Sequence, residues 1–247
     1  MARIYSKIMS ILAALETDPP VKAVMPFFLA NKGTFFLAIS SKRRLQPLET
    51  KLLRRVILAS TSPRRRELVA SLQIPFDVVP SHADESTPDT WSPEQIVMEL
   101  AARKANAVYN TLTETSKDGV IVGSDTIVVR DGVVLGKPGD EQEAAAMLSS
   151  LQGRSHTVYT GVACQDGVTG NMKVDYRSTV VTMKALTEDE VWAYARSGEG
   201  LDKAGAYAIQ GLGATIVTGI EGCYFNVVGL PLSLLVDMLA EFDIHVL

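Results

Sequence analysis

Residues 56–66 of this chain read VILASTSPRRR, an apolar run followed by hydroxyl side chains, a proline and three arginines. Consecutive apolar residues bounded by a turn signal are typical of a short buried strand. Pro63 then stands in the first turn of a helix that we expect over residues 64–72, and the hydroxyl of Ser62 just before it is a usual helix-start signal. The stretch therefore predicts a strand that passes through a short loop into a helix.

Strands and helices alternate along the rest of the chain after residue 56. Residues 120–129 are mostly apolar and predict a strand. The polar run 123–125 lies inside it, and we expect this run to break the strand. Asp131 and Gly132 predict a hairpin turn. Alternating strands and helices with some hairpins predict an α/β fold with a mixed central sheet. Strands are expected over 56–59, 76–79, 120–129, 133–135, 156–164 and 174–183, and helices over 64–72, 92–108, 141–151 and 188–197.

Length and charge narrow the class of protein. The chain has 247 residues, enough for one sizeable core or for two small lobes around a cleft. Its net charge of −4 hides an asymmetry, because residues 1–55 carry ten Lys and Arg against three Asp and Glu. The remainder is acidic, which excludes a nucleic-acid binder, since a duplex backbone demands a basic face. Two cysteines are too few for a disulfide framework or a zinc site.

The first 53 residues differ from the rest and show no clean period. We expect residues 1–53 to be a basic extension, either a leader or a poorly ordered segment, before a domain over residues 54–247. The apolar patches at 25–30 and 34–39 together span roughly 15 residues with a charge and a glycine between them, which is short for a membrane span. We expect a cytoplasmic protein that binds no membrane, and the basic N-terminus leaves organelle targeting open.

The loop between the first strand and helix is suited to bind an anion. A helix N-terminus offers free backbone N–H groups and the positive end of its dipole. Ser60 and Ser62 add hydroxyl donors, and Arg64 and Arg65 can grip phosphate oxygens through two hydrogen bonds each. The structural alternative is a helix cap at Ser62 with solvated arginines. Because cations in a first helical turn oppose the dipole, a bound anion is favoured.

Acidic side chains are expected at the edge of the sheet where the loop after the first strand lies. Asp125 lies inside an otherwise apolar strand, where a charge is costly unless it is paired or bound to a metal. Glu85 follows the second strand, and carboxylates that meet at one edge form an oxygen-rich magnesium site. The hairpin at 131–132 can return Lys137 towards Asp125. The alternatives are a surface aspartate, a solvated acidic loop and a loop lysine.

Two further features stand beside these motifs. Lys104 lies on the helix expected over 92–108, where a lone lysine is usually on the surface. The glycine-bearing loop over 202–211 includes Lys203 and suits close approach to a ligand. Gln210 in that loop offers both a donor and an acceptor to the edge of a base. The sequence contains no GxxxxGK[ST] motif, no GxGxxG motif and no Ser–His–Asp spacing.

Taken together, these motifs resemble the Maf family of nucleotide pyrophosphatases from residue 56 to the C-terminus. The resemblance implies an elongated two-lobed Maf/ITPase-like α/β fold with a mixed central sheet and a cleft, often as a homodimer. It also implies hydrolysis between the α- and β-phosphates with the divalent metal Mg²⁺ or Mn²⁺. The motifs that carry it are LASTSPRR (58–65), GSDT (123–126), LGKP (135–138), TGVA (160–163), DKAGAYAIQG (202–211) and NVVGLP (226–231).

The resemblance also implies roles for single residues. Asp125 is similar to the catalytic carboxylate that accepts a proton, and Glu85 is similar to the second acid that holds the metal with it. Arg64, Thr126 and Gln210 match positions that set substrate choice. Two departures from the family are Gly136, where many relatives have Glu, and the extension over 1–53. Lys137 is expected to be catalytic together with Asp125 and Glu85. The expected substrate contacts are Ser60, Ser62, Arg64, Arg65, Lys104, Thr126, Lys203 and Gln210.

The run Ile209-Gln210-Gly211 is similar to the branch of the family that prefers dTTP and UTP. We therefore expect hydrolysis of dTTP, UTP or related modified pyrimidine nucleotides to the monophosphate and pyrophosphate. Asp125 would orient or deprotonate a water for attack on the α-phosphorus. One alternative is a 7-methyl-GTP pyrophosphatase, whose branch has an acidic tripeptide at 209–211. The other is a nucleotide-binding regulator without catalysis, which would need neither Asp125 nor Lys137.

Overall fold

The computed structural model describes residues 30–31, 34–35 and 54–247. The chain divides into two units, residues 1–52 and 53–247. In the first, the two-residue strands β1 (Ala30–Asn31) and β2 (Thr34–Phe35) pair antiparallel. The predicted leader or poorly ordered extension lies almost entirely outside the described residues and stays a prediction. No helix in the described part of the chain is long and apolar enough to cross a membrane.

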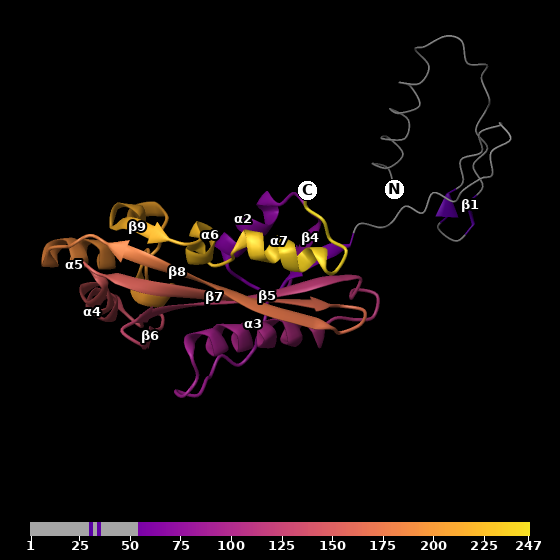
Figure 1. Ribbon diagram of the computed structural model, residues 1–247, viewed down its shortest axis with the longest axis horizontal. Coiled ribbons are helices and arrows are strands. Elements are labelled where there is room, and N and C mark those ends of the chain that lie inside the picture. The colour runs from indigo at the N-terminus through magenta and orange to yellow at the C-terminus, as the bar shows by residue number, and fades with distance from the viewer. Residues whose placement is uncertain (1–29, 32–33, 36–53) are drawn as a thin grey trace, which may run out of the picture. The chain divides into compact units, whose positions relative to one another are not determined.

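A seven-stranded sheet organises the second unit (Figure 1). Its main order is β4-β3-β5-β7-β8-β9, and β6 pairs with β5. β3 is parallel to both β4 and β5, whereas all other pairs are antiparallel, so the predicted mixed sheet is confirmed. The strands are β3 (Arg55–Leu58), β4 (Phe76–Val78), β5 (Gly119–Arg130), β6 (Val133–Leu135), β7 (Ser155–Asp166), β8 (Met172–Met183) and β9 (Val217–Glu221).

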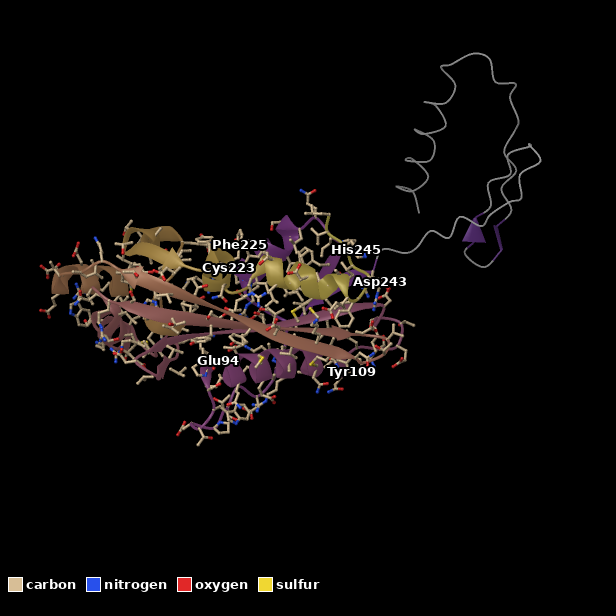
Figure 2. All side chains as sticks on the ribbon, in the orientation of Figure 1. Glu94, Tyr109, Cys223, Phe225, Asp243 and His245 are labelled. Carbon is tan, nitrogen blue, oxygen red and sulfur yellow. The ribbon has the colours of Figure 1, made fainter. Side chains whose placement is uncertain are left out.

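Helices cover both faces of this sheet. Figure 1 shows α3 along one face, with α2 and α7 on the opposite face. In Figure 2, Glu94 and Tyr109 mark α3 on the first face, and Phe225 of α6 lies on the other. The helices are α2 (Pro63–Ser71), α3 (Pro93–Tyr109), α4 (Glu141–Leu151), α5 (Glu188–Arg196), α6 (Tyr224–Val228) and α7 (Leu232–Ala240), with the 3-10 turns η1 (Ala204–Ala206) and η2 (Gly211–Thr215).

Alternating side chains of the central strands supply the cores. Val56 and Leu58 of β3 pack in the cluster that contains α7, whereas Ile57 between them packs against α3. This division follows from the strand period of two, which sends successive side chains to opposite faces. A third cluster joins the far ends of β5, β7 and β8 to α4 and α5. The strands are apolar on both faces because helices cover both.

Local signals in the sequence account for most element boundaries. The Ser62 hydroxyl caps α2, and Ser92 forms a capping box with Gln95 at the start of α3. Asp131 and Gly132 adopt φ angles of 50° and 78°, which is the hairpin turn expected before β6. The C-terminal elements β9, α6 and α7 were not predicted.

The predicted break in the strand over 120–129 is wrong, because β5 runs unbroken from Gly119 to Arg130. Its polar run stays in the ladder with β7, where Gly123 pairs with Ala163 and Asp125 pairs with Gly161. The backbone hydrogen bonds of the ladder tolerate polar side chains as long as other elements provide partners for them. The polar run is therefore part of a continuous strand.

Two glycines set how closely α3 approaches the sheet. A Cβ built on Gly123 would lie 2.2 Å from the carbonyl oxygen of Ala101, and one on Gly161 would lie 2.1 Å from that of Val97. Real Cβ atoms do not come this close to atoms to which they are not bonded, and the partner atoms are helix backbone that cannot swing aside. The close approach brings the α3 side chains over the middle of β5.

We predict that Gly161→Ala will lower the free energy of unfolding by about 1–3 kcal/mol, the usual cost of overpacking a core. Urea denaturation measures the change. Gly219→Ala in β9 is the matched control, because no heavy atom lies within 4 Å of its Cβ position. A Gly161→Ala protein as stable as this control would show that the α3 approach is not tight.

Candidate active site

Strand β5 has a gap in its pairing on one edge. β3 pairs with residues 119–122 of β5, and β6 pairs with residues 128–130. Between them, residues 123–127 have no strand partner on this edge within the described part of the chain, while β7 pairs with β5 on the other edge throughout. A cavity of about 890 Å³ opens here, which is a volume typical of small-ligand sites.

The walls of the cavity come from segments that lie far apart in the sequence. They include the loop after β3, the loop before α3, the hairpin end at 134–137, the loop over 202–210 and the turn at 227–229. Every residue predicted for the site lines this one cavity, and their chemical roles stay predictions. These residues are Ser60, Ser62, Arg64, Arg65, Glu85, Lys104, Asp125, Thr126, Lys137, Lys203 and Gln210.

Two carboxylates meet at one ammonium group in the cavity. The Nζ atom of Lys104 donates to Asp125 Oδ1 at 2.6 Å and lies 2.7 Å from Glu85 Oε1. Asp125 is only 8% exposed, so its charge depends on this partner. The hydrogen bond from Lys104, together with its charge, holds the pKa of Glu85 below its usual range. Lys104 is therefore a cavity residue and not the surface lysine that a lone helical position suggests.

Neighbouring residues of β5 bring the opposite face of the sheet into the same site. Ser124 Oγ donates to the carbonyl oxygen of Gly229 at 3.1 Å, and Thr126 Oγ1 accepts from Arg65 Nη2 at 3.0 Å. Asp125 between them reaches Lys104 on α3. Because no strand closes this edge, side chains from both faces can line one cavity. The GSDT motif thus divides its contacts between α3 on one face and the first turn of α2 and Gly229 on the other.

Arg65 supplies a cation without an acidic partner. Its Nε atom donates to the carbonyl oxygen of Gly229 at 2.8 Å. Burial lowers the pKa of Arg65, and the charges of Asp125 and Glu85 oppose that effect. Among residues 54–247, no carboxylate lies within 4.0 Å of its guanidinium. The positive charge is therefore available to an anion in the cavity.

The hydroxyl groups of the loop after β3 can cap helix α2 and bind an anion at the same time. Ser62 Oγ caps α2 by accepting from the backbone N–H of Arg65 at 3.5 Å, and Ser60 Oγ accepts from the N–H of Ser62 at 3.1 Å. Each oxygen acts as an acceptor, which leaves its own O–H free to donate. The helix cap is present, and it does not exclude anion binding.

The remaining predicted residues differ in their contacts. Lys137 lines the cavity after the hairpin, and its charge contributes to the lowered pKa of Glu85. Lys203 instead donates to Asp202 and to the backbone carbonyl of Glu199 within its own loop. Gln210 lines the cavity, and no hydrogen bond of its side chain occurs within the described residues.

A divalent metal ion fits this site only if the protein and the substrate both supply its ligands. No cluster of three or more Asp, Glu, His or Cys side chains occurs in the described part of the chain. The Lys104 ammonium binds one oxygen of each carboxylate, Glu85 Oε1 and Asp125 Oδ1, so the second oxygen of each remains to bind a metal. Mg²⁺ is commonly held by one or two carboxylates together with substrate phosphates. The residues present fit that arrangement.

Several contacts at the site were missed by sequence reasoning. Arg103 donates to the backbone carbonyls of Asp84 and Ser86 at 3.3 and 2.7 Å, so it holds both sides of Glu85. Thr160 Oγ1 donates to the carbonyl of the fully buried Asn226 at 2.8 Å. The position of Arg103 beside Lys104 on α3 was the available signal for the first contact. Nothing in the sequence pattern pairs Thr160 with Asn226.

The cations at this open sheet edge can bind phosphate oxygens directly, and the two carboxylates can do so through a divalent metal. The comparison with known families is more specific. Residues 55–242 match the Maf-like protein family, and the chain belongs to this family.

Bacterial relatives match the chain over nearly their whole length. It is 48% identical over 195 residues to the dTTP/UTP pyrophosphatase of Pelotomaculum thermopropionicum, covering 79% of this chain and 100% of the relative. It is 51% identical over 192 residues to that of Moorella thermoacetica, covering 78% and 97%. The Staphylococcus aureus Ham1 protein is 14% identical in sequence, with a TM-score of 0.38 over 62% of this chain and 85% of that one.

Behind the cavity, His156 is a buried base with a pH-dependent effect on stability. It is 4% exposed, its Nε2 atom lies 2.7 Å from the hydroxyl of the cavity residue Tyr207, and burial lowers its pKa from 6.5 to about 4. The folded state thus binds this proton less tightly than the unfolded state. Stability that the neutral ring contributes is present above pH 6.5 and is lost as the pH falls towards 4.

We predict that His156→Gln will reduce the slope of unfolding free energy against pH between 6.5 and 4. A single depressed group contributes up to about 1.4 kcal/mol per pH unit in such a window. Urea denaturation at a series of pH values compares the variant with the wild type. The exposed His245→Gln is the control. Equal slopes for wild type and His156→Gln would contradict the assignment.

Proposed function

We propose that this chain is a nucleoside-triphosphate pyrophosphatase that hydrolyses dTTP, UTP or related modified pyrimidine nucleotides to the monophosphate and pyrophosphate. Relatives of about half identity that the chain covers from end to end carry the name dTTP/UTP pyrophosphatase. The single structural observation behind the proposal is the convergence of Asp125 and Glu85 on Lys104, inside a cavity lined by further cations.

The cations would bind the triphosphate. Arg65 has no acidic partner within 4.0 Å among residues 54–247. The one ion pair of Arg64 there is loose, with 4.0 Å between its Nη1 atom and Asp202 Oδ2. Together with Lys137 they would neutralise the charge that develops on the phosphate oxygens during transfer, which is usually the largest catalytic term. Ser60 and Ser62 would add hydroxyl donors at the N-terminus of α2, where backbone N–H groups favour anions.

Asp125 would be the general base. Its carboxylate is nearly buried, and Lys104 fixes one of its oxygens at 2.6 Å. The other oxygen is free to accept a proton from a water in the cavity, and that water attacks the α-phosphorus. The bond to the bridging oxygen then breaks, and pyrophosphate leaves with both of its phosphorus atoms. Lys104 stabilises the carboxylate and orients it.

Glu85 and Asp125 would hold the divalent metal, Mg²⁺ or Mn²⁺, together with phosphate oxygens of the substrate. When bound, the ion would neutralise charge on the phosphates and polarise them. Arg103 keeps Glu85 at the cavity through the carbonyls of Asp84 and Ser86.

The base of the nucleotide would lie against the loop over 207–210. Gln210 has donor and acceptor groups that suit the edge of a pyrimidine. Thr126, which matches a position of substrate choice, would act by orienting Arg65, because its hydroxyl accepts from that guanidinium at 3.0 Å. The neutral tripeptide at 209–211 favours dTTP and UTP over 7-methyl-GTP.

The reaction would act on the cytoplasmic nucleotide pool, from which it would remove unwanted triphosphates. The family resemblance also implies a homodimer, and sedimentation of the purified protein measures that state.

We predict that Asp125→Asn will lower turnover of UTP by about 10²-fold or more, since a positioned general base contributes on that scale. Release of pyrophosphate, detected separately from phosphate, is the measurement. Asp237→Asn is the matched control, because Asp237 is exposed on α7. Turnover near the wild-type level in folded Asp125→Asn would rule out the assigned base.

We also predict that chelation of divalent ions will abolish pyrophosphate release and that added Mg²⁺ or Mn²⁺ will restore it. Because residues 54–247 provide only two convergent carboxylates, we expect weak metal binding without nucleotide and tighter binding with it. Titration calorimetry with and without a non-hydrolysable triphosphate tests this. Full activity in chelator would contradict the metal assignment.

A further inference from the structure

The loop that lines the proposed base end of the cavity has little secondary structure of its own. Residues 207–210 line the cavity and connect the short 3-10 turns η1 and η2 between α5 and β9. Gln210 directly precedes η2, and its side chain does not cap that turn. Contacts from outside this stretch must therefore hold it in place.

One tyrosine–glutamate pair provides these contacts. The carboxylate of Glu199 accepts from the backbone N–H groups of Leu212 and Gly213, each at 2.9 Å. The hydroxyl of Tyr194 on α5 donates to Glu199 Oε2 at 2.6 Å and accepts from the N–H of Ala208 at 3.1 Å. Backbone groups on both sides of Gln210 thus end on the same pair.

The charge states of Glu199 and Tyr194 suit the binding of these backbone groups. Burial raises the pKa of Glu199, but hydrogen bonds from Tyr194, Gly213 and Leu212 outweigh it, and the pKa lies below its usual range. Burial and the bond to Glu199 raise the pKa of Tyr194. At neutral pH the pair is therefore a carboxylate and a hydroxyl, and the bonds to the ionised acceptor are of the stronger kind.

The residue next to Gln210 fits around this carboxylate. Gly211 has a φ of +62°, and a Cβ there would lie 2.0 Å from Glu199 Oε1. A side chain here would strain this backbone conformation and would displace the Glu199 carboxylate. The carboxylate therefore packs directly against the backbone beside Gln210, and Lys203 adds a bond to the backbone carbonyl of Glu199.

We propose that Glu199 and Tyr194 are positioning residues for base selection, because they fix residues 208–213 and so fix where the carboxamide of Gln210 meets the nucleotide. This inference rests on the proposed function, in which Gln210 reads the base. Uracil presents a carbonyl acceptor where cytosine presents an amino donor. A carboxamide has both kinds of group, so it distinguishes the two bases only when it is held at a defined place.

The test is selective binding of non-hydrolysable α,β-methylene analogues of UTP and CTP, measured by calorimetry as the ratio of their dissociation constants. The variants are Glu199→Gln, Tyr194→Phe and Gln210→Ala, alone and combined. We expect the ratio to fall about tenfold in each of the first two, on the scale of one lost charge-assisted hydrogen bond. In the Gln210→Ala background neither should reduce it further. Glu188→Gln, exposed in the first turn of α5, should keep the wild-type ratio.

Hydrogen exchange gives a second measurement that does not depend on the ligand. The amides of Ala208, Leu212 and Gly213 should exchange faster in Glu199→Gln or Tyr194→Phe, while those of the central strands keep their protection.

Three results would overturn the inference. They are a wild-type protein that binds both analogues equally, an unchanged ratio in folded Glu199→Gln and Tyr194→Phe, and a further loss of selectivity in the Gln210→Ala background. Hydrolysis of UTP decides the proposed function separately. Selective binding without pyrophosphate release would contradict the proposed hydrolase and support the positioning role. Pyrophosphate release with unchanged selectivity in the variants would support the hydrolase and contradict the positioning role.

Discussion

The gap in the edge pairing of β5 is the constraint on which the site depends. β3 ends after Leu58 and β6 begins only at Val133, so residues 123–127 keep β7 as their one strand neighbour among the described residues. A strand paired on both edges would have kept the two faces of the sheet apart. Here Asp125 contacts α3 while Thr126 contacts Arg65 in the first turn of α2, and both line one cavity.

Charged side chains near this gap stabilise one another, so the residues proposed for function also affect the stability of the fold. Lys104 is 13% exposed and Asp125 11% exposed at their side chains, so removing either would leave a poorly solvated charge behind. Arg65 is held by a carbonyl and a hydroxyl, which direct it without neutralising it. Such an arrangement costs stability in the empty protein and favours an anionic ligand. The apolar clusters on both faces of the sheet offset that cost.

Much of this arrangement follows from the sequence, because its signals are local. The strand–loop–helix unit at 55–71, the capped α3 and the hairpin at Asp131 depend on neighbouring residues, and motif spacing placed the predicted residues around one cavity. The continuity of β5 could not be predicted, since partners far away in β7 hold its polar run in the ladder. The contacts of Arg103 with the loop around Glu85, and of Thr160 with Asn226, likewise depend on tertiary packing. No periodicity encodes such pairs.

The position of bond cleavage is the central claim, and labelled water tests it most directly. UTP would be hydrolysed by the full chain with Mg²⁺ in ¹⁸O-enriched water, and the products would be analysed by mass spectrometry. The account predicts one ¹⁸O atom in the nucleoside monophosphate and unlabelled pyrophosphate, because water attacks the α-phosphorus. Label in pyrophosphate, or release of single phosphates with a nucleoside diphosphate, would contradict it.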